Sequence, residues 1–468
     1  MLNPMVHLYN MNAHPIDFEI NQNVFSTPEV TAIFDERTRY QRWLDFEASL
    51  AKVQAELEII PAEAAIEICN KAKLEHIDLE EVRRGYQKSR NSIVPLLNGL
   101  KAACDHGYGE YVHYGATTQD VIDTSEILEI RDTLSIVYRD LRDLEAKCLE
   151  LAIRHKSTPI AARTHGQQAL PTTFGMKVAV WLSEIRRHIE RVKHLNTVLC
   201  IGQLSGAVGT MAALGPKAFE VVERTLKDLG LKHSPLAWHT SRDSIGELSA
   251  VFSLVVTTCT KIANEIFQLQ KIEISELREP SANAASSSTM PHKQNPVICQ
   301  RIVALSRHVR HLSGTIMESL PHEHERDARC LWAEWLAVPQ LCIYTGTALN
   351  YTLNVISGLN VLEENMLKNL YIQKHFIVSE WLLFRLSHAM GKMAAMDKLR
   401  LLSKEARDGG KSLKDAVTTD PELKNLLGED EISMLDHPER YIGQAVRIVE
   451  ETVENIRQQR MIDPEEVK

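Results

Sequence analysis

The most constraining feature of this sequence is a set of three long stretches that contain neither glycine nor proline. They run from Ala116 to Thr158, from Met176 to Ile201 and from Glu247 to Glu279. Glycine and proline break helices most strongly, and an average globular helix has only about 11 to 12 residues. At about 1.5 Å per residue, the first stretch would reach about 60 Å as a single helix. We therefore expect a chain built around unusually long helices.

Apolar residues recur at helical spacing inside these stretches. The stretch after Glu247 is the richest, with Leu248, Val251, Leu254, Val255, Ile262, Ile266 and Leu269. A helix with that much apolar surface belongs inside a bundle. The segments after Pro296 and from Leu331 onward are also predicted to be helices. Residues 116–362 are thus predicted to form a central domain, a bundle of very long helices.

Shorter segments flank this bundle. A break around Gly107 to Gly109 closes a predicted N-terminal helical domain of residues 1–115. The sequences Asp408-Gly-Gly-Lys and Asp420-Pro predict loops between short helices in a C-terminal helical domain of residues 363–468. Only 21 glycines and 17 prolines occur in 468 residues, which favours an all-α fold with three helical domains.

Charge and hydropathy limit the possible partners. The formal net charge is -9, whereas a nucleic-acid partner requires a basic face. No apolar stretch is judged to reach the roughly 18 residues that span a bilayer. The N-terminus lacks the basic start and apolar run of a signal peptide. We expect neither nucleic acid nor membrane as a partner, and a cytoplasmic location.

The eight cysteines indicate no cofactor or metal site. No two of them form a CxxC pair, and none begins a zinc-ribbon spacing. They are interpreted as free thiols, buried as small apolar side chains in a reducing cytosol.

A run of small polar residues is the first candidate for chemistry. Residues 281–289 read SANAASSST and follow Pro280, which predicts a mobile loop. Lys293 and Asn295 come next, and then a helix with Pro296 in its first turn. A helix N-terminus with a lysine and an amide nearby suits a carboxylate. The alternative is a surface loop in which a serine caps the helix.

Three motifs in this chain resemble those of the fumarase/aspartase superfamily. Residues 287–295, SSTMPHKQN, resemble its SSxMPxKxN motif, and residues 113–120, HYGATTQD, are similar to its HxGxTSxD block. Residues 163–175, RTHGQQALPTTFG, resemble its RTHxxxAxPTTFG block. The resemblance extends from about Phe25 to about Gln444. It implies three helical domains, and a homotetramer whose central helices form a twenty-helix core. It also implies active sites where segments of three subunits meet around a small dicarboxylate substrate.

The resemblance also implies roles for individual residues. The family removes a proton next to a carboxylate and expels a leaving group from the neighbouring carbon. Ser287 matches the proton-abstracting serine, His165 the general acid and His113 a second active-site histidine. Lys293 and Asn295 match the groups that hold a substrate carboxylate, as do Thr117 and Thr118. The remaining residues expected to bind substrate are Thr164, Gln167, Arg242, Ser288, Met290, Arg326, Asn91 and Ser92.

Several of these residues have simpler interpretations. His113 could be an ordinary satisfied polar residue. Thr117 could be the N-cap of the long helix that follows it. Arg242 could form a surface ion pair. The segment from His322 to Arg326 is not HExxH, and histidines two apart do not share a helix face, so it is interpreted as a substrate-binding segment rather than a metal site.

Two branches of the family compete. The segments Trp238-His-Thr-Ser-Arg-Asp and Trp332-Ala-Glu-Trp335 look like 3-carboxy-cis,cis-muconate cycloisomerase. That enzyme typically has an apolar residue at the position of His165, whereas adenylosuccinate lyase has a histidine there. Trp335 replaces an arginine that helps adenylosuccinate lyase to hold its nucleotide. We expect a fumarate-releasing lyase acting on an N-substituted aspartate. The alternatives are a cycloisomerase and, more remotely, a non-catalytic structural tetramer.

Overall fold

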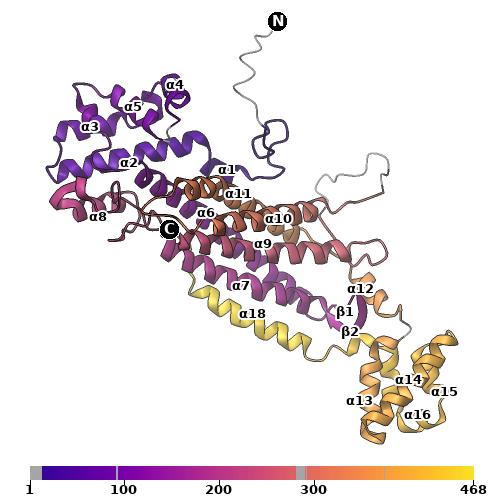
Figure 1. The fold of residues 1–468 in the computed structure, drawn as a ribbon. Coiled ribbons are helices and arrows are strands. Elements are labelled where there is room, and N and C mark those ends of the chain that lie inside the picture. Colours follow the sequence, from indigo (N-terminus) through magenta and orange to yellow (C-terminus); the bar gives the residue numbers. More distant parts are fainter. Residues whose placement is uncertain (1–12, 91–92, 281–289, 291, 374, 468) are drawn as a thin grey trace.

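Five long helices lie side by side and form the body of the molecule (Figure 1). The structure, a computed structural model, describes residues 13–90, 93–280, 290, 292–373 and 375–467. The predicted long helices are confirmed. They are α6 (Thr118–Arg154), α7 (Phe174–Leu199), α9 (Asp243–Leu269), α10 (Val297–Glu318) and α11 (Ala328–Ser357).

The apolar helix α9 shows why these elements pack as a bundle. It contacts α7, α10 and α11, and its buried face includes Leu248, Phe252 and Ile262. Contrary to the expectation from sequence, α9 does contain a window long and apolar enough to cross a membrane, but 61% of that window is buried inside the fold. Its apolar surface is thus used in the bundle, and length and composition alone do not identify a membrane span.

One helix of 21 residues, α2, and several short helices cover the end of the bundle where α6 begins. They are α1 (Pro28–Ile33), α2 (Glu36–Glu56), α3 (Ala62–Lys71), η2 (Leu74–His76), α4 (Leu79–Ser89), α5 (Val94–Ala103) and η3 (Tyr108–Tyr111). Helix α2 packs on α6 and on α8 (Ala218–Asp228), which follows η4 (Ala212–Lys217). This part of the chain shares one continuous apolar core with the long helices.

Two small antiparallel sheets lie at the opposite end of the bundle. β1 (Pro159–Thr164) pairs with β2 (Gln167–Thr173), and β3 (Leu277–Arg278) pairs with β4 (Asn360–Val361). The β1–β2 hairpin follows α6 and leads into α7 (Figure 1). The all-α expectation contained no strands, because the motif that forms this hairpin carries no period-2 alternation of apolar residues long enough to predict one.

The C-terminal segment divides into two parts. The first has a separate apolar core and consists of α12 (Glu363–Leu370), η5 (Phe376–Val378), α13 (Ser379–Met390), α14 (Lys392–Asp408), α15 (Leu413–Thr419), α16 (Pro421–Leu426), α17 (Glu429–Asp436) and η6 (Pro438–Arg440). The second, α18 (Ala445–Met461), returns along α7 and α6 and adds Val449 and Val453 to the main core. The domain limits 1–115, 116–362 and 363–468 remain a proposal.

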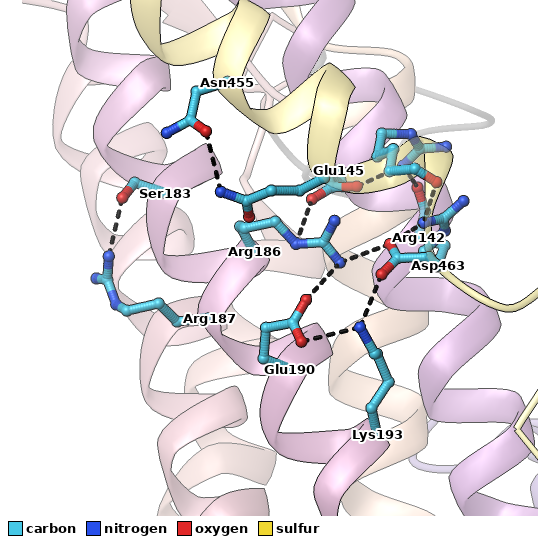
Figure 2. Close-up of polar contacts among 11 residues, drawn as sticks. Arg142, Glu145, Ser183, Arg186, Arg187, Glu190, Lys193, Asn455 and Asp463 are labelled. Carbon is cyan, nitrogen blue, oxygen red and sulfur yellow. Dashed lines mark hydrogen bonds and ion pairs between the residues drawn. The ribbon is translucent and has the colours of Figure 1, made fainter.

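Buried charges hold α18 in place (Figure 2). The carboxylate of Asp463, just after α18, accepts hydrogen bonds from Arg142, Arg186 and Lys193. Glu145 pairs with Arg186 on one side and with an arginine of α18 on the other. Because the Asp463 side chain is fully buried, this cluster fixes the end of α18 against α6 and α7.

Candidate active site

The segment before α6 brings His113 next to an acid. Nδ1 of His113 lies 2.7 Å from Oε1 of Glu47, which α2 contributes and which is almost completely buried. Burial by itself lowers the pKa of the imidazole, but the charge and hydrogen bond of Glu47 outweigh it and raise the pKa of His113 above its usual value. The pair therefore orients His113 and favours its charged form, as a group that handles protons requires.

Thr117 begins α6, and its hydroxyl meets a second predicted site residue. Thr117 is the N-cap of α6, and its backbone N–H donates to Asp120, 3.0 Å away. Nη1 of Arg326 donates to its side-chain oxygen across 3.0 Å. The capping role and a role in the site therefore coexist at this residue. Thr118, the first residue of α6, is half-buried beside it.

Asp120 organises the backbone around this end of α6. Its carboxylate accepts from the N–H groups of Ser205 and Gly206 at 3.0 and 2.9 Å, and lies 3.0 Å from Nε2 of His239. The residue is completely buried. Asp120 therefore fixes the loops near Thr117 through these hydrogen bonds, and it does not itself face a ligand.

His165 stands at the tip of the β1–β2 hairpin. Thr164 pairs with Gln167, so His165 and Gly166 form a two-residue turn. Both have positive φ, 52° and 75°, as in the type I′ turn that suits the twist of a hairpin. His165, Thr164 and Gln167 are all exposed, so the turn presents the imidazole to solvent.

The hairpin is fastened to the rest of the molecule by a buried acid. Arg163 donates two hydrogen bonds to Glu276, at 2.9 and 2.8 Å, and Asn369 donates to the same carboxylate at 2.7 Å. Glu276 is completely buried. This bidentate pair links β1, the strand before His165, to the segment after α9. It therefore fixes the position of the turn relative to that segment.

A carboxylate of the chain itself is bound at the N-terminus of α10. Glu279 accepts from the N–H groups of Ile298 and Cys299, at 2.9 and 2.8 Å. The predicted attraction of this helix end for a carboxylate is thus satisfied within the chain at these two groups. Lys293, exposed, and Asn295, half-buried, lie just before the helix and remain open to a ligand.

Other predicted residues of this segment can be placed only in part. Met290 is exposed, with 41% of its surface accessible. Ser287, Ser288, Asn91 and Ser92 lie outside the described residues. Their roles in the site therefore stay predictions.

The predicted contact between Arg242 and substrate is not supported by its surroundings. Its side chain is fully buried and lies 3.1 Å from Asp123, with a two-point ion pair to Glu334. The guanidinium also sits 4.8 Å over the ring of Trp238. Burial raises the pKa of Asp123 to about 6 despite the charge of Arg242. Arg242 is therefore a buried charge partner inside the bundle, neither a surface ion pair nor an accessible ligand.

The accessible site residues fall into two groups at opposite ends of the bundle. His113, Thr117 and Arg326 lie where α6 begins. His165 follows α6 in the β1–β2 hairpin, and this hairpin and the start of α10, which Lys293 precedes in the chain, lie at the other end of the bundle (Figure 1). Helix α6 has 37 residues, about 55 Å at 1.5 Å per residue. Within one copy, the length of α6 therefore keeps these two groups at opposite ends of the bundle.

Comparisons with known proteins agree with the three motifs. A family model described as "Lyase" matches residues 23–310, and one described as "Adenylosuccinate lyase C-terminus" matches residues 375–452. The chain belongs to the fumarase/aspartase superfamily. It falls in the adenylosuccinate lyase and cycloisomerase branch and is a lyase.

The individual relatives include both lyases of succinyl compounds and a lactonizing enzyme. The chain is 36% identical over 444 residues to N-acetyl-S-(2-succino)cysteine lyase of Dickeya dadantii, covering 95% of this chain and 98% of that protein. It is 38% identical over 448 residues to adenylosuccinate lyase of Methanothermobacter thermautotrophicus, covering 95% and 99%. The structure of 3-carboxy-cis,cis-muconate lactonizing enzyme from Pseudomonas putida matches with a TM-score of 0.87 at 32% identity, covering 93% and 98%.

Sequence reasoning missed the acids that support the site. Glu47, Glu276 and Glu279 were not singled out, although Glu47 follows the buried Phe46 and Glu276 precedes the buried Leu277. A charged residue in such a place must find a partner when it is buried, and that was the available signal. The partner itself could not be named, because each lies far away in the sequence or on another element.

Proposed function

We propose that this superfamily member catalyses β-elimination from a succinyl compound, an N- or S-substituted succinate, and releases fumarate. The observation that supports it most is His165, exposed at the tip of an anchored hairpin. A histidine there can protonate a departing nitrogen or sulfur, because imidazole is the side chain that most often acts as a general acid. Relatives named for succinylated substrates align over almost the whole chain.

The proposed reaction divides the work among a few groups. Ser287 removes the proton from the carbon next to a carboxylate, and Lys293 and Asn295 hold that carboxylate while its negative charge grows. Donors placed in advance around the developing charge stabilise it more than they stabilise the substrate. The bond to the leaving nitrogen or sulfur then breaks with its electron pair, and His165 supplies that atom with a proton.

We propose that the complete site is shared between copies in a homotetramer. The two groups of site residues lie at opposite ends of α6, so a second copy has to supply the missing group. The substrate is a small dicarboxylate, for which Arg326 and Thr117 at one end and Lys293 at the other offer donors.

A cycloisomerase is the second candidate. The structural match to the lactonizing enzyme favours it, and so does Trp335. The indole of Trp335 packs against Trp43 and Trp332 and under the guanidinium of Arg39, so it supplies no charge for a nucleotide phosphate. This also makes adenylosuccinate itself a less suitable substrate than a smaller succinyl compound.

The decisive experiment is ultraviolet detection of fumarate from the purified protein. Adenylosuccinate, argininosuccinate and N-acetyl-S-(2-succino)cysteine are offered in turn, with 3-carboxy-cis,cis-muconate in parallel. Fumarate from any of the first three supports the proposal and identifies the leaving group. Loss of the muconate absorbance without fumarate from any of the three contradicts it and favours the cycloisomerase.

We also propose that the protein works in the cytosol. All eight cysteines lie within the described residues as free thiols, and most of them are buried. Burial raises the pKa of thiols such as Cys148 and Cys342, which keeps them unreactive. Fractionation of the host cells tests this: an enzyme found with membranes would contradict it.

A further inference from the structure

A cavity opens directly beside the hairpin that carries His165. Its volume is about 600 Å³, and it lies between β2 and the small C-terminal helices. Gln167 and Gln168 form one wall, and Phe376 of η5 and Arg407 of α14 form the other. Gln167 is only two residues from His165, so the cavity begins at the tip of the hairpin.

The cavity wall is positively charged. Arg407 and Lys411 line it, and none of its described lining residues is an aspartate or glutamate. The guanidinium of Arg407 lies 5.6 Å over the ring of Phe376, and its Nε donates to the carbonyl of Ser403 at 3.2 Å. Within the part of the chain that the structure describes, its two terminal nitrogens have no partner. They are thus held in place on a rigid ring and available to an anion.

Neutral amides complete the wall. Gln373 donates to the carbonyl of Gln168 at 3.2 Å, and the side chain of Gln168 donates to the carbonyl of Asn369 at 3.0 Å. The buried amide oxygen of Gln168 finds no hydrogen-bond partner among the described residues. The cavity is thus lined by neutral amides and two cations, a combination that suits a ligand with both a hydrogen-bonding group and a negative charge.

We infer that this cavity binds the negatively charged end of the leaving group, a carboxylate or a phosphate, while His165 protonates the atom that departs. The inference rests on the proposed function and adds the chemistry of the leaving group to it. Arg407 is the main anion contact, and Lys411 is the second. Because the nucleotide-binding arginine is replaced by Trp335, these cations offer another means of selecting an anionic substrate.

Binding of a leaving-group product tests the inference without turnover. The probes are N-acetylcysteine, which carries a carboxylate, and N-acetylcysteine amide, which does not, titrated calorimetrically into the intact enzyme. We expect the acid to bind the natural protein about ten to a hundred times more tightly than the amide, as a charge-assisted pair implies. Arg407→Met should remove most of this preference, and Arg407→Lys should keep part of it.

Lys404→Met is the matched control. Lys404 is an exposed cation on the same helix and does not line the cavity, so the preference for the acid should remain in this variant. Lys411→Met provides an independent second variant and should reduce the preference to a smaller extent. Equal binding of acid and amide to the natural protein, or a preference that survives Arg407→Met, would overturn the inference.

The same variants separate this inference from the proposed function. Arg407→Met should raise KM for a substrate with an anionic leaving group and leave kcat nearly unchanged. If no succinyl compound yields fumarate but N-acetylcysteine still binds through Arg407, the proposed function fails and the binding site stands. If fumarate forms and the preference for the acid is absent, only the cavity inference fails.

Discussion

Five histidines among the described residues have positive φ, and two of them, His113 at 64° and His165 at 52°, lie in motifs of the superfamily. Residues other than glycine seldom adopt this conformation, and strain of this kind collects at functional sites. The two differ in their surroundings. His113 is fixed by the buried Glu47, whereas His165 depends on its turn and remains exposed. Its exposure suits His165 for contact with substrate. His113 is suited to a role in which Glu47 sets its orientation and charge.

Replacing His165 tests its role in protonating the leaving group. His165→Leu should lower kcat for fumarate release by about a hundredfold to ten-thousandfold, the usual contribution of a general acid. Turnover of 3-carboxy-cis,cis-muconate, if any is found, should suffer less. His388→Leu, which removes an exposed histidine from α13, serves as the control. Equal small effects on both reactions would remove His165 from the acid role.

Ser287 is tested in the same way. Ser287→Ala should lower turnover by about a hundredfold or more with the fold intact, because no other group is expected to take the proton. Ser281→Ala, in the same segment, should leave turnover unchanged. Near-normal activity of the Ser287 variant, measured by fumarate absorbance, would show that another residue is the base.

The Glu47–His113 pair predicts how stability depends on pH. Glu47 raises the pKa of His113 above 6.5, so the pair stabilises the fold fully below that pH, and the stabilisation is lost as pH rises through the higher folded-state value. Glu47→Gln should therefore lower the midpoint of thermal unfolding more at pH 6 than at pH 9. A loss that is equal at both values, or larger at pH 9, would show that the pair is not charged in the folded protein.

Among the elements, the hairpin and α18 are both placed by charged groups from distant segments. Arg163 holds the hairpin through Glu276, and Asp463 holds the end of α18 through three cations of α6 and α7. In both cases the side chain of the acid is fully buried; Glu276 receives one cation and an amide, whereas Asp463 receives three cations. Such an acid fixes the position of an element, because removing it leaves buried cations without a partner.

Asp463→Asn tests this at α18. It should cost about 3 to 5 kcal/mol of stability, the usual effect of breaking a buried ion pair. Burial alone would raise the pKa of Asp463, but hydrogen bonds from Lys193 and Arg186 lower it overall, so the stabilisation should persist above about pH 4 and be lost on acidification. Asp430→Asn, on an exposed turn of α17, is the control. A thermal midpoint equal to that of the control would contradict the role of Asp463.

For the whole molecule, the important feature is the length of α6. The helix is about 55 Å long and lies between the segments that carry His113 and His165, which is why we propose that a complete site is shared between copies. The charge and the apolar content of the surface do not determine how those copies associate. Activity of mixed assemblies can decide it.

Mixing inactive variants tests the shared site. His113→Leu and His165→Leu should each be inactive alone. In randomly mixed oligomers about one site in four should combine intact histidines from two copies and recover activity, as a symmetric assembly predicts. Native mass spectrometry measures the oligomer size and confirms mixing. Mixed oligomers with no activity would contradict a site built from both groups.

Much of this protein is determined by local sequence. The long helices follow from stretches without glycine or proline, and the motif residues that carry the chemistry are contiguous in the chain. The N-cap at Thr117 is equally local, because its partner Asp120 is three residues away. These features depend on backbone geometry and neighbours within a few residues, which a sequence displays directly.

Tertiary structure alone decided the rest. Glu47 is 66 residues from His113, and Glu276 is 113 residues from Arg163, so no local pattern links them. The hairpin under His165, the burial of Arg242 and the cavity beside Gln167 likewise depend on which distant segments pack together. The physical reason is that a buried charge must be neutralised by whatever the fold places next to it, and a sequence shows that need without showing the partner.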